Sequence, residues 1–168
     1  MFLVVGSTNV DLFIGGVDAL PHWGGDEFAV GNLAWCKQPL HLGIGGNGAN
    51  TAYVLGKLGA PVRLGSAIGD DLLGTIVAGW LDAAGVDRRW LGVRADAGTS
   101  TTTVVSDAAF HRLSFHHPGA YATFSLADLP LGWEAEINVL LITGYPLLAQ
   151  LRPDGCRELL RKAKTAGA

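Results

Sequence analysis

GIGGNGANTAYVLGKLGAPVRLGSAIG, residues 43–69, opens with four glycines in six positions and then carries apolar side chains at helical spacing. Apolar residues from Ala52 to Leu58 fall on one face of the predicted helix, which ends at Gly59. The next segment, Val62–Ile68, has the length and apolar character of a strand buried in a parallel sheet. A glycine-rich helix entrance followed by such a strand predicts an α/β fold.

The first six of these residues, Gly43–Gly48, also fit the G-x-G-x-x-G pattern of dinucleotide-binding folds. That pattern requires a buried parallel strand directly before it and an acidic residue about 20 positions later. Residues 35–42 instead contain a lysine, a glutamine and a proline, which interrupt an apolar strand. Asp70 has suitable spacing, but it precedes the next helix-like segment and is expected to be its N-cap. A dinucleotide-dependent oxidoreductase is therefore the least favoured function.

Segments on both sides extend the α/β pattern. In the last predicted helix, Leu159, Leu160 and Ala163 are expected to face inward. Residues 11–42 alternate short apolar pieces with glycine and proline, which predicts irregular β-structure beside the main sheet. The remaining predicted elements are strands at Phe2–Val5, Thr101–Val105, Leu113–Phe115 and Ile137–Ile142, and helices at Leu72–Leu81 and Arg157–Lys164.

Three separated motifs resemble the ribokinase-like (PfkB) carbohydrate kinase family. They are Val5–Asp11, the run Gly45–Ala52 with Gly59 and Gly69 beyond it, and Phe115–Ala120. The resemblance implies a Rossmann-like, mainly parallel sheet flanked by helices, with a small β-lid built from parts of 11–44 and 99–117. Residues 1–168 would then be the amino-terminal part of one ribokinase-like domain.

The residue types near these motifs suit a ligand that carries several hydroxyl groups. Asn9 and Asp11 follow the first predicted strand, at the sheet end where open α/β folds bind ligands. A carboxylate accepts two hydroxyl hydrogens, and an amide both donates and accepts. Gly45 and Gly46 allow the backbone to approach a ligand closely. Unpaired amides at the start of the following helix would suit a phosphate.

The resemblance assigns roles to the matching positions. Those that would bind the acceptor are Asn9, Asp11, Gly45, Gly46 and Asn50, and those near the transferred phosphate are Asn47 and Gly48. Two positions depart from the family pattern, because many relatives have lysine at position 47 and asparagine at position 121, where this chain has Asn47 and Tyr121.

The resemblance implies ATP-dependent phosphorylation of a hydroxymethyl group of a sugar, with Mg²⁺, this chain supplying the acceptor-binding half. A nucleoside kinase of the same family and a non-catalytic sugar-binding or regulatory module stay open as alternatives. In relatives, the catalytic base and the anion hole lie together in a D-T-x-G-A-G-D stretch. This sequence lacks that stretch, so no catalytic residue is assigned. A strand followed by a crossover helix is also expected to lead into another parallel strand. We therefore expect a fragment that is inactive alone.

Composition and charge limit the kinds of partner that this chain is expected to bind. A net charge of -3 predicts no nucleic-acid or anionic membrane surface, and we expect a cytoplasmic protein. Cys36 and Cys156 are too far apart to suggest a zinc or disulfide framework and are expected to be reduced and buried. The neighbouring His116 and His117 are interpreted as a lid or surface pair, with no metal site. Family lids often pair between protomers, which implies a homodimer with Trp23 and Trp35 at its interface.

Overall fold

The computed structural model describes residues 1–18, 20 and 35–168, and its main layer is a four-stranded parallel sheet. In the order β5-β4-β1-β8, its strands are Leu91–Arg94, Val62–Gly69, Phe2–Val5 and Val139–Ile142. Every pair in this sheet is parallel, and each strand is joined to the next by a crossover. All eight residues of β4 are buried, as expected for a central parallel strand.

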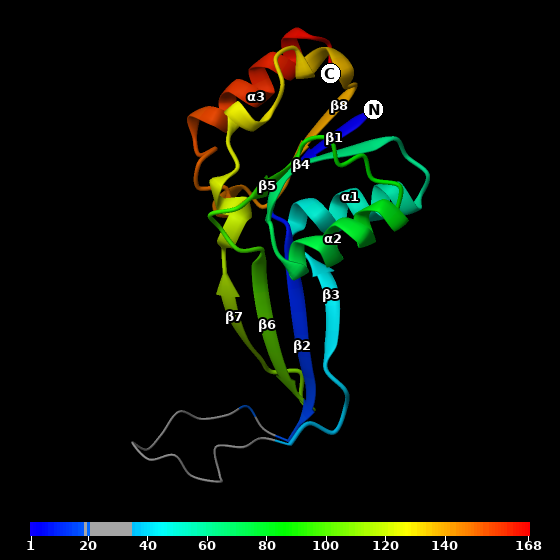
Figure 1. Ribbon diagram of the computed structural model, residues 1–168, viewed down its shortest axis with the longest axis vertical. Helices are drawn as coiled ribbons and strands as arrows, with labels where there is room; N and C mark the ends of the chain where they lie inside the picture. The colour runs from blue at the N-terminus through cyan, green and yellow to red at the C-terminus, as the bar shows by residue number, and fades with distance from the viewer. Residues whose placement is uncertain (19, 21–34) are drawn as a thin grey trace.

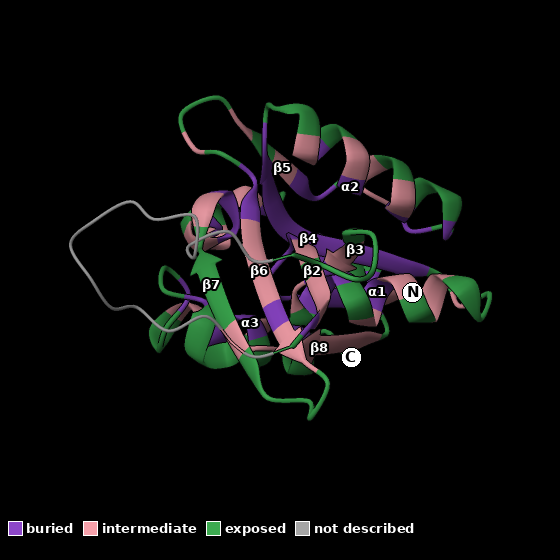
Figure 2. Ribbon diagram, turned by 90° about the horizontal axis from the view of Figure 1, so that it is seen from below, coloured by how far each residue is buried: buried purple, intermediate pink, exposed green. Residues whose placement is uncertain are grey.

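A second sheet projects away from this layer, and we call it the projecting sheet (Figure 1). In the order β3-β2-β6-β7, its strands are His41–Gly45, Asn9–Val17, Ser100–Asp107 and Arg112–His117. The β2–β6 pair is parallel, and the two outer pairs are antiparallel. Figure 2 shows β4 buried along its length while β7 is largely exposed. Among the described residues, the projecting sheet therefore has exposed surfaces.

Helices cover both faces of the parallel sheet. Helices α1 (Asn47–Lys57) and α2 (Leu72–Ala83) lie on one face, and α3 (Asp154–Thr165) lies on the other (Figure 1). Short 3₁₀ helices complete the α3 side, at Gly119–Thr123, Leu126–Asp128, Trp133–Glu136 and Tyr145–Leu147. The result is a three-layer α/β arrangement, as the sequence predicts.

The alternation of side chains along β1 divides the core into two parts. Leu3 and Val5 pack with α3 and the 3₁₀ segments, whereas Val4 packs with α1 and α2. All three side chains are fully buried. Period-two alternation explains this division, because successive strand residues point to opposite faces of a sheet.

Several local expectations are wrong. The N-cap of α2 is Asp71, whose extended backbone lets its carboxylate accept a hydrogen bond from the Gly74 amide; Asp70 instead donates its own amide to the carbonyl of Arg94. Leu160 is 55% exposed, because only Leu159 and Ala163 of its stripe meet the core. Cys36 is also exposed, whereas Cys156 is buried as expected. Trp35 is exposed in the single chain, so its place at a dimer interface stays a prediction, and Trp23 lies outside the described residues.

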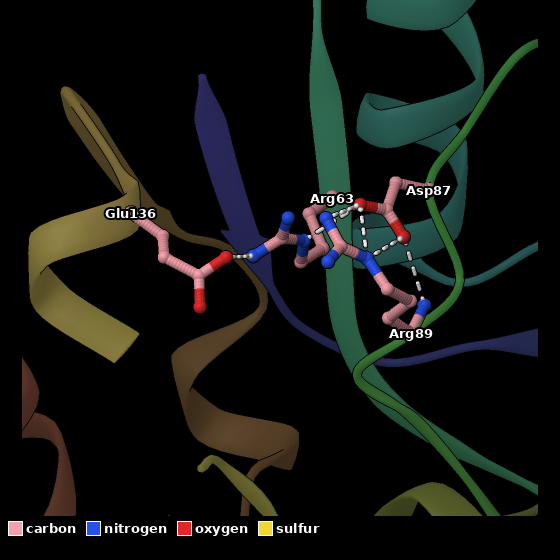
Figure 3. A network of polar contacts seen from close by, with 4 residues as sticks. All are labelled: Arg63, Asp87, Arg89 and Glu136. Carbon is pink, nitrogen blue, oxygen red and sulfur yellow. Dashed lines mark hydrogen bonds and ion pairs between the residues drawn. The ribbon is translucent and has the colours of Figure 1, made fainter. Parts of the chain in front are cut away.

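A buried arginine joins three elements at the amino end of the parallel sheet (Figure 3). Arg63 on β4 is 1% exposed and donates to Asp87 Oδ2 at 2.8 Å and to Glu136 Oε2 at 2.9 Å. Its guanidinium lies 4.0 Å from the centroid of the Trp90 ring. Arg89 adds a second cation at Asp87, with 2.9 Å between Nη2 and Oδ2. We call these four charged residues the amino-end cluster.

In the part of the chain that the structure describes, no helix combines the length and the apolar character needed to cross a membrane.

Candidate functional site

The site is centred on the first residues of β2, just past the end of β1. Strand register brings them to the glycine motif, because Asn9 stands opposite Gly45 and Asp11 stands opposite Gly43. Asn9 is 4% exposed, and Asp11 is half-buried. Segments more than thirty residues apart in sequence therefore meet at the sheet end predicted for ligand binding.

Both glycines of the pair are required by this contact. A Cβ at Gly45 would collide with Asp11 Oδ1 and Asn9 Nδ2. Gly46 has φ +86°, and a Cβ there would lie 2.7 Å from Asn9 Oδ1. Glycine adopts that φ without the strain of an L side chain. The polar ends of Asn9 and Asp11 consequently lie directly over bare backbone.

A chain of hydrogen bonds extends from this pair across the projecting sheet. Asn9 Nδ2 donates to Asp11 Oδ1 and, at 3.1 Å, to Thr102 Oγ1. Thr102 Oγ1 lies 3.0 Å from His116 Nδ1, and His116 Nε2 lies 2.9 Å from the hydroxyl of the buried Tyr121. Asp11, Thr102 and His116 are in register on three adjacent strands.

Sequence reasoning missed Thr102 and placed His116 in a lid or surface pair, without a role at the site. Residue type gave no signal for either, because threonine and histidine residues are common on exposed strands. The usable signal was strand register, because only pairing of the predicted strands places Thr102 and His116 in the same cross-strand row as Asp11. Tyr121, noted as a departure from the family pattern, ends this chain of hydrogen bonds.

Burial dominates the electrostatics of Asp11. Desolvation raises the pKa of its carboxyl, and the hydrogen bond with Thr102, the nearby His116 and the hydrogen bond with Asn9 offset part of that rise. Thr102 and Asn9 are neutral, so they orient the carboxylate without neutralising it. Asp11 can thus still accept hydrogen bonds from a ligand.

The expectation of unpaired amides at the start of α1 is wrong. Ser7 Oγ accepts a hydrogen bond from the Asn47 amide at 3.0 Å. The carbonyl oxygen of Ser7 accepts from the Gly48 and Ala49 amides at 3.0 and 3.1 Å. Ser7 is 1% exposed, so the loop after β1 caps this helix from inside the protein. A phosphate would have to displace these bonds to reach the amides.

The other predicted residues of the α1 entrance lie around this capped end. Gly48 is buried, and a Cβ there would meet the backbone of Gly6. Asn47 is exposed, with its side chain close to Gly144 at the end of β8. Asn50 is exposed on the first turn of the helix. The structure therefore brings Asn9, Asp11 and the glycine pair together, and leaves Asn47 and Asn50 at the edge of the site.

The described residues offer no group of three or more histidine, cysteine or acidic side chains able to hold a metal ion. The described part of the chain therefore supplies no such set of ligands for Mg²⁺. Two cavities of about 390 and 370 Å³ lie between β8 and α3, the larger lined by residues that include Tyr145, Cys156 and Arg157. Neither is lined by the residues around Asp11.

The strand before the G-x-G-x-x-G pattern is of the wrong kind for a dinucleotide fold. β3 runs antiparallel to β2 in the projecting sheet, and its first two residues are exposed. A dinucleotide site needs a buried strand of the parallel sheet at this position.

Comparisons with known proteins agree with this geometry. A profile of the family described as pfkB family carbohydrate kinase matches residues 3–168. The nucleoside kinase of Methanothermobacter thermautotrophicus is 31% identical over 122 residues, which are 72% of this chain and 40% of that protein. The 5-dehydro-2-deoxygluconokinase of Shouchella clausii is 28% identical over 127 residues, which are 74% of this chain and 39% of that protein.

Among solved structures, Arabidopsis thaliana ribokinase complexed with ribose and ATP aligns with a TM-score of 0.76 and 23% identity. The alignment covers 99% of this chain and 51% of the ribokinase chain. The likeness in fold thus extends through the whole chain, which spans about half the length of that structure and less than half of either curated relative.

Proposed function

The chain belongs to the pfkB family of carbohydrate kinases, and from this premise we propose that it binds the phosphate acceptor of a sugar or nucleoside kinase. The reaction proposed for the whole protein is transfer of phosphate from ATP, with Mg²⁺, to a hydroxymethyl group. The observation that supports this most directly is the convergence of Asn9 and Asp11 on the Gly45–Gly46 backbone.

In this proposal the Asp11 carboxylate accepts hydrogens from two acceptor hydroxyls, and the Asn9 side chain orients it. The bare backbone of Gly45 and Gly46 allows the acceptor to lie close to both side chains. Thr102 and His116 hold the geometry from the opposite side. Asn47 and Asn50, at the edge of the site, are proposed to contact the acceptor or the incoming phosphate.

Calorimetric titration of the purified chain with ribose, fructose, adenosine and uridine tests the site. Replacing Asp11 with alanine removes charge-assisted hydrogen bonds worth about 1.5–3 kcal/mol each, so the affinity for any bound acceptor should fall at least tenfold. Asp154→Ala is the matched control, since Asp154 is an exposed carboxylate on α3. Equal affinities in the Asp11→Ala and Asp154→Ala variants would remove Asp11 from the site.

Phosphoryl transfer also needs a base for the acceptor hydroxyl and donors for the γ-phosphate. We assign neither to this chain, and we expect the 168-residue protein to release no ADP from ATP and Mg²⁺ when an acceptor is added. Acceptor-dependent ADP release would contradict that expectation. Acceptor binding without turnover is also what a sugar-binding or regulatory module would show, and a downstream G-A-G-D stretch in the gene would distinguish the kinase.

The projecting sheet further supports the proposal of a homodimer. Leu42, Leu12, Thr103 and Phe115 stand in one cross-strand row on the face opposite Asp11. Leu42 is 44% and Phe115 47% exposed, so a second copy packed on this row would bury apolar surface. Sedimentation should show a dimer that Leu42→Glu converts to monomer, while Leu160→Glu on α3 does not. A wild-type monomer at high concentration would contradict the dimer.

A cytoplasmic location stays a prediction.

A further inference from the structure

The face of the projecting sheet that carries Asn9 and Asp11 continues outward into an aromatic pair. Side chains alternate along a strand, so Phe13 follows Asp11 on the same face of β2. Phe13 stands opposite His41 of β3, and their ring centroids are 6.1 Å apart with an interplanar angle of 31°. Phe13 is 39% exposed, and His41 is also exposed. Polar and aromatic groups therefore follow one another on one open face.

Gly43, which has no side chain, lets the two rings lie close to Asp11. It stands opposite Asp11, and a Cβ at Gly43 would point toward Phe13 Cε2 at 3.4 Å and His41 Nε2 at 3.9 Å. On the other side of Asp11, the same cross-strand row is occupied by Thr102 and His116. A ligand held at Asp11 can thus extend over Gly43 toward the rings, whereas the β7 side is filled.

The spacing selects the kind of ligand. Two residues along an antiparallel strand advance about 6.8 Å, which separates the level of Asp11 from the level of Phe13. A single sugar ring held by Asn9 and Asp11 would meet only the near edges of the Phe13 and His41 rings, which lie over Gly43. A nucleoside has a planar ring attached directly to its furanose, and aromatic side chains stack on nucleobases of any sequence. Of the two acceptor classes, the nucleoside uses both parts of the face.

We propose that Phe13 and His41 form a base-binding subsite and that the acceptor is a nucleoside rather than a free sugar. The inference rests on the proposed function, because the furanose must be held by Asn9 and Asp11. It assigns the sugar hydroxyls to the buried, polar part of the face and the base to its outer, aromatic part.

The test compares adenosine and uridine with ribose and fructose on the purified chain. At least one nucleoside should bind about tenfold or more tightly than ribose, a difference of about 1.4 kcal/mol. In saturation-transfer NMR, the base protons of that nucleoside should receive saturation together with the ribose protons. This second measurement uses the unaltered chain, so it holds even if a variant fails to fold.

Variants then locate the subsite. Phe13→Ala should reduce nucleoside affinity to that of ribose and leave ribose affinity unchanged, whereas Phe13→Tyr should retain most of the preference. Phe115→Ala is the matched control, because it removes a similarly exposed ring from the opposite face of the same sheet and should leave the nucleoside-to-ribose ratio unaltered.

Other outcomes separate the two proposals. Equal binding of nucleoside and ribose, or an unchanged preference in Phe13→Ala, overturns the base subsite and leaves the acceptor site at Asp11 standing. Preference for fructose over both nucleosides also overturns it. If none of the four compounds binds, the proposed function of this chain fails, and the base subsite fails with it.

Discussion

Two polar clusters lie at opposite ends of the parallel sheet, one around Arg63 near the start of β4 and the other around Asp11 just past the end of β1. In the first, burial raises the pKa of Asp87, but hydrogen bonds from Arg89 and Arg63 outweigh it and set the pKa at about 2. In the second, burial also raises the pKa of Asp11, and its partners only partly offset the rise. Desolvation raises the pKa of both carboxyls, but the net shift is downward for Asp87 and upward for Asp11.

The difference lies in where the compensating groups come from. Asp87 receives two guanidinium groups from its own chain, so its charge is neutralised when the protein folds. Asp11 receives an amide from Asn9 and a hydroxyl from Thr102, with His116 nearby, and together these offset only part of the rise in its pKa that burial causes. A cluster closed in this way stabilises the fold, whereas an open one costs stability and keeps hydrogen-bonding capacity for a ligand. Four measurements test this distinction.

The largest expected effect is at Arg63. Arg63→Ala should lower the free energy of unfolding by about 3 kcal/mol, because it leaves two carboxylates without their shared cation and opens a cavity beside Trp90. Urea unfolding followed by Trp fluorescence measures the change.

Arg89 provides the control for that measurement, because it contacts the same carboxylate from the surface. Its side chain is 67% exposed, so solvent screens its ion pair and Arg89→Ala should cost much less stability than Arg63→Ala. Similar losses in the two variants would mean that burial of the cation does not decide the strength of the amino-end cluster.

The next effect appears on acidification. A lowered folded-state pKa contributes stability that is present above the ordinary value near 3.8 and is lost as the pH falls toward about 2. For Asp87 this loss should amount to about 2 kcal/mol. Urea unfolding at pH 5 and at pH 2.5 should show a smaller difference for Asp87→Asn than for the wild type. An equal difference in both proteins would place the acid sensitivity elsewhere.

Most of the fold could be predicted from the sequence, because local patterns determine it. The run Val62–Ile68 is apolar apart from Arg63 and Ser66, and it forms the buried β4. Glycines ended the helices near where the structure ends them, as at Gly59. The resemblance to the ribokinase-like family is confirmed by the match over residues 3–168. Errors arose at boundaries such as Asp70 and Asp71, where two adjacent residues of one type compete for one cap.

The site was less accessible to sequence reasoning, because its contacts are set by strand register. Asn9 and Asp11 stood out by their position after a strand, but Thr102 and His116 join them only through pairing across three strands. The capping of α1 by Ser7 was missed for a related reason, since a cap from forty residues away leaves no local pattern. Arg63 likewise gave no sign that its partners would come from Asp87 and Glu136.

A third, smaller effect tests whether a carboxylate at the carboxyl end of the sheet stabilises the fold when its hydrogen bonds come from the chain itself. Asp71 lies at the carboxyl end of β4, but its carboxylate accepts from the Gly74 amide at 2.8 Å and from the Thr99 amide and hydroxyl at 2.7 Å. Asp71→Ala should destabilise the protein by about 1.5 kcal/mol, because it removes an N-cap and the anchor of Thr99. Asp71→Asn should cost less in the same urea titration. If neither substitution lowered the free energy of unfolding, hydrogen bonds within the chain would not make a carboxylate at this end of the sheet stabilising.

The smallest effect, and the one of opposite sign, is expected at Asp11. Asp11→Asn keeps an acceptor oxygen for Asn9 and Thr102 but removes the desolvated charge, so it should raise the free energy of unfolding at pH 7 by less than about 1 kcal/mol. Because the folded-state pKa is raised, the stability contributed by the protonated carboxyl is complete below about pH 4 and is lost as the pH rises through the folded value. The stability gap between Asp11→Asn and wild type should therefore open between pH 4 and pH 7, and acceptor affinity should fall in the same variant. A gap that widens on acidification would mean that Asp11 is compensated within the chain like Asp87, and that the carboxyl end of the sheet holds no charge reserved for a ligand.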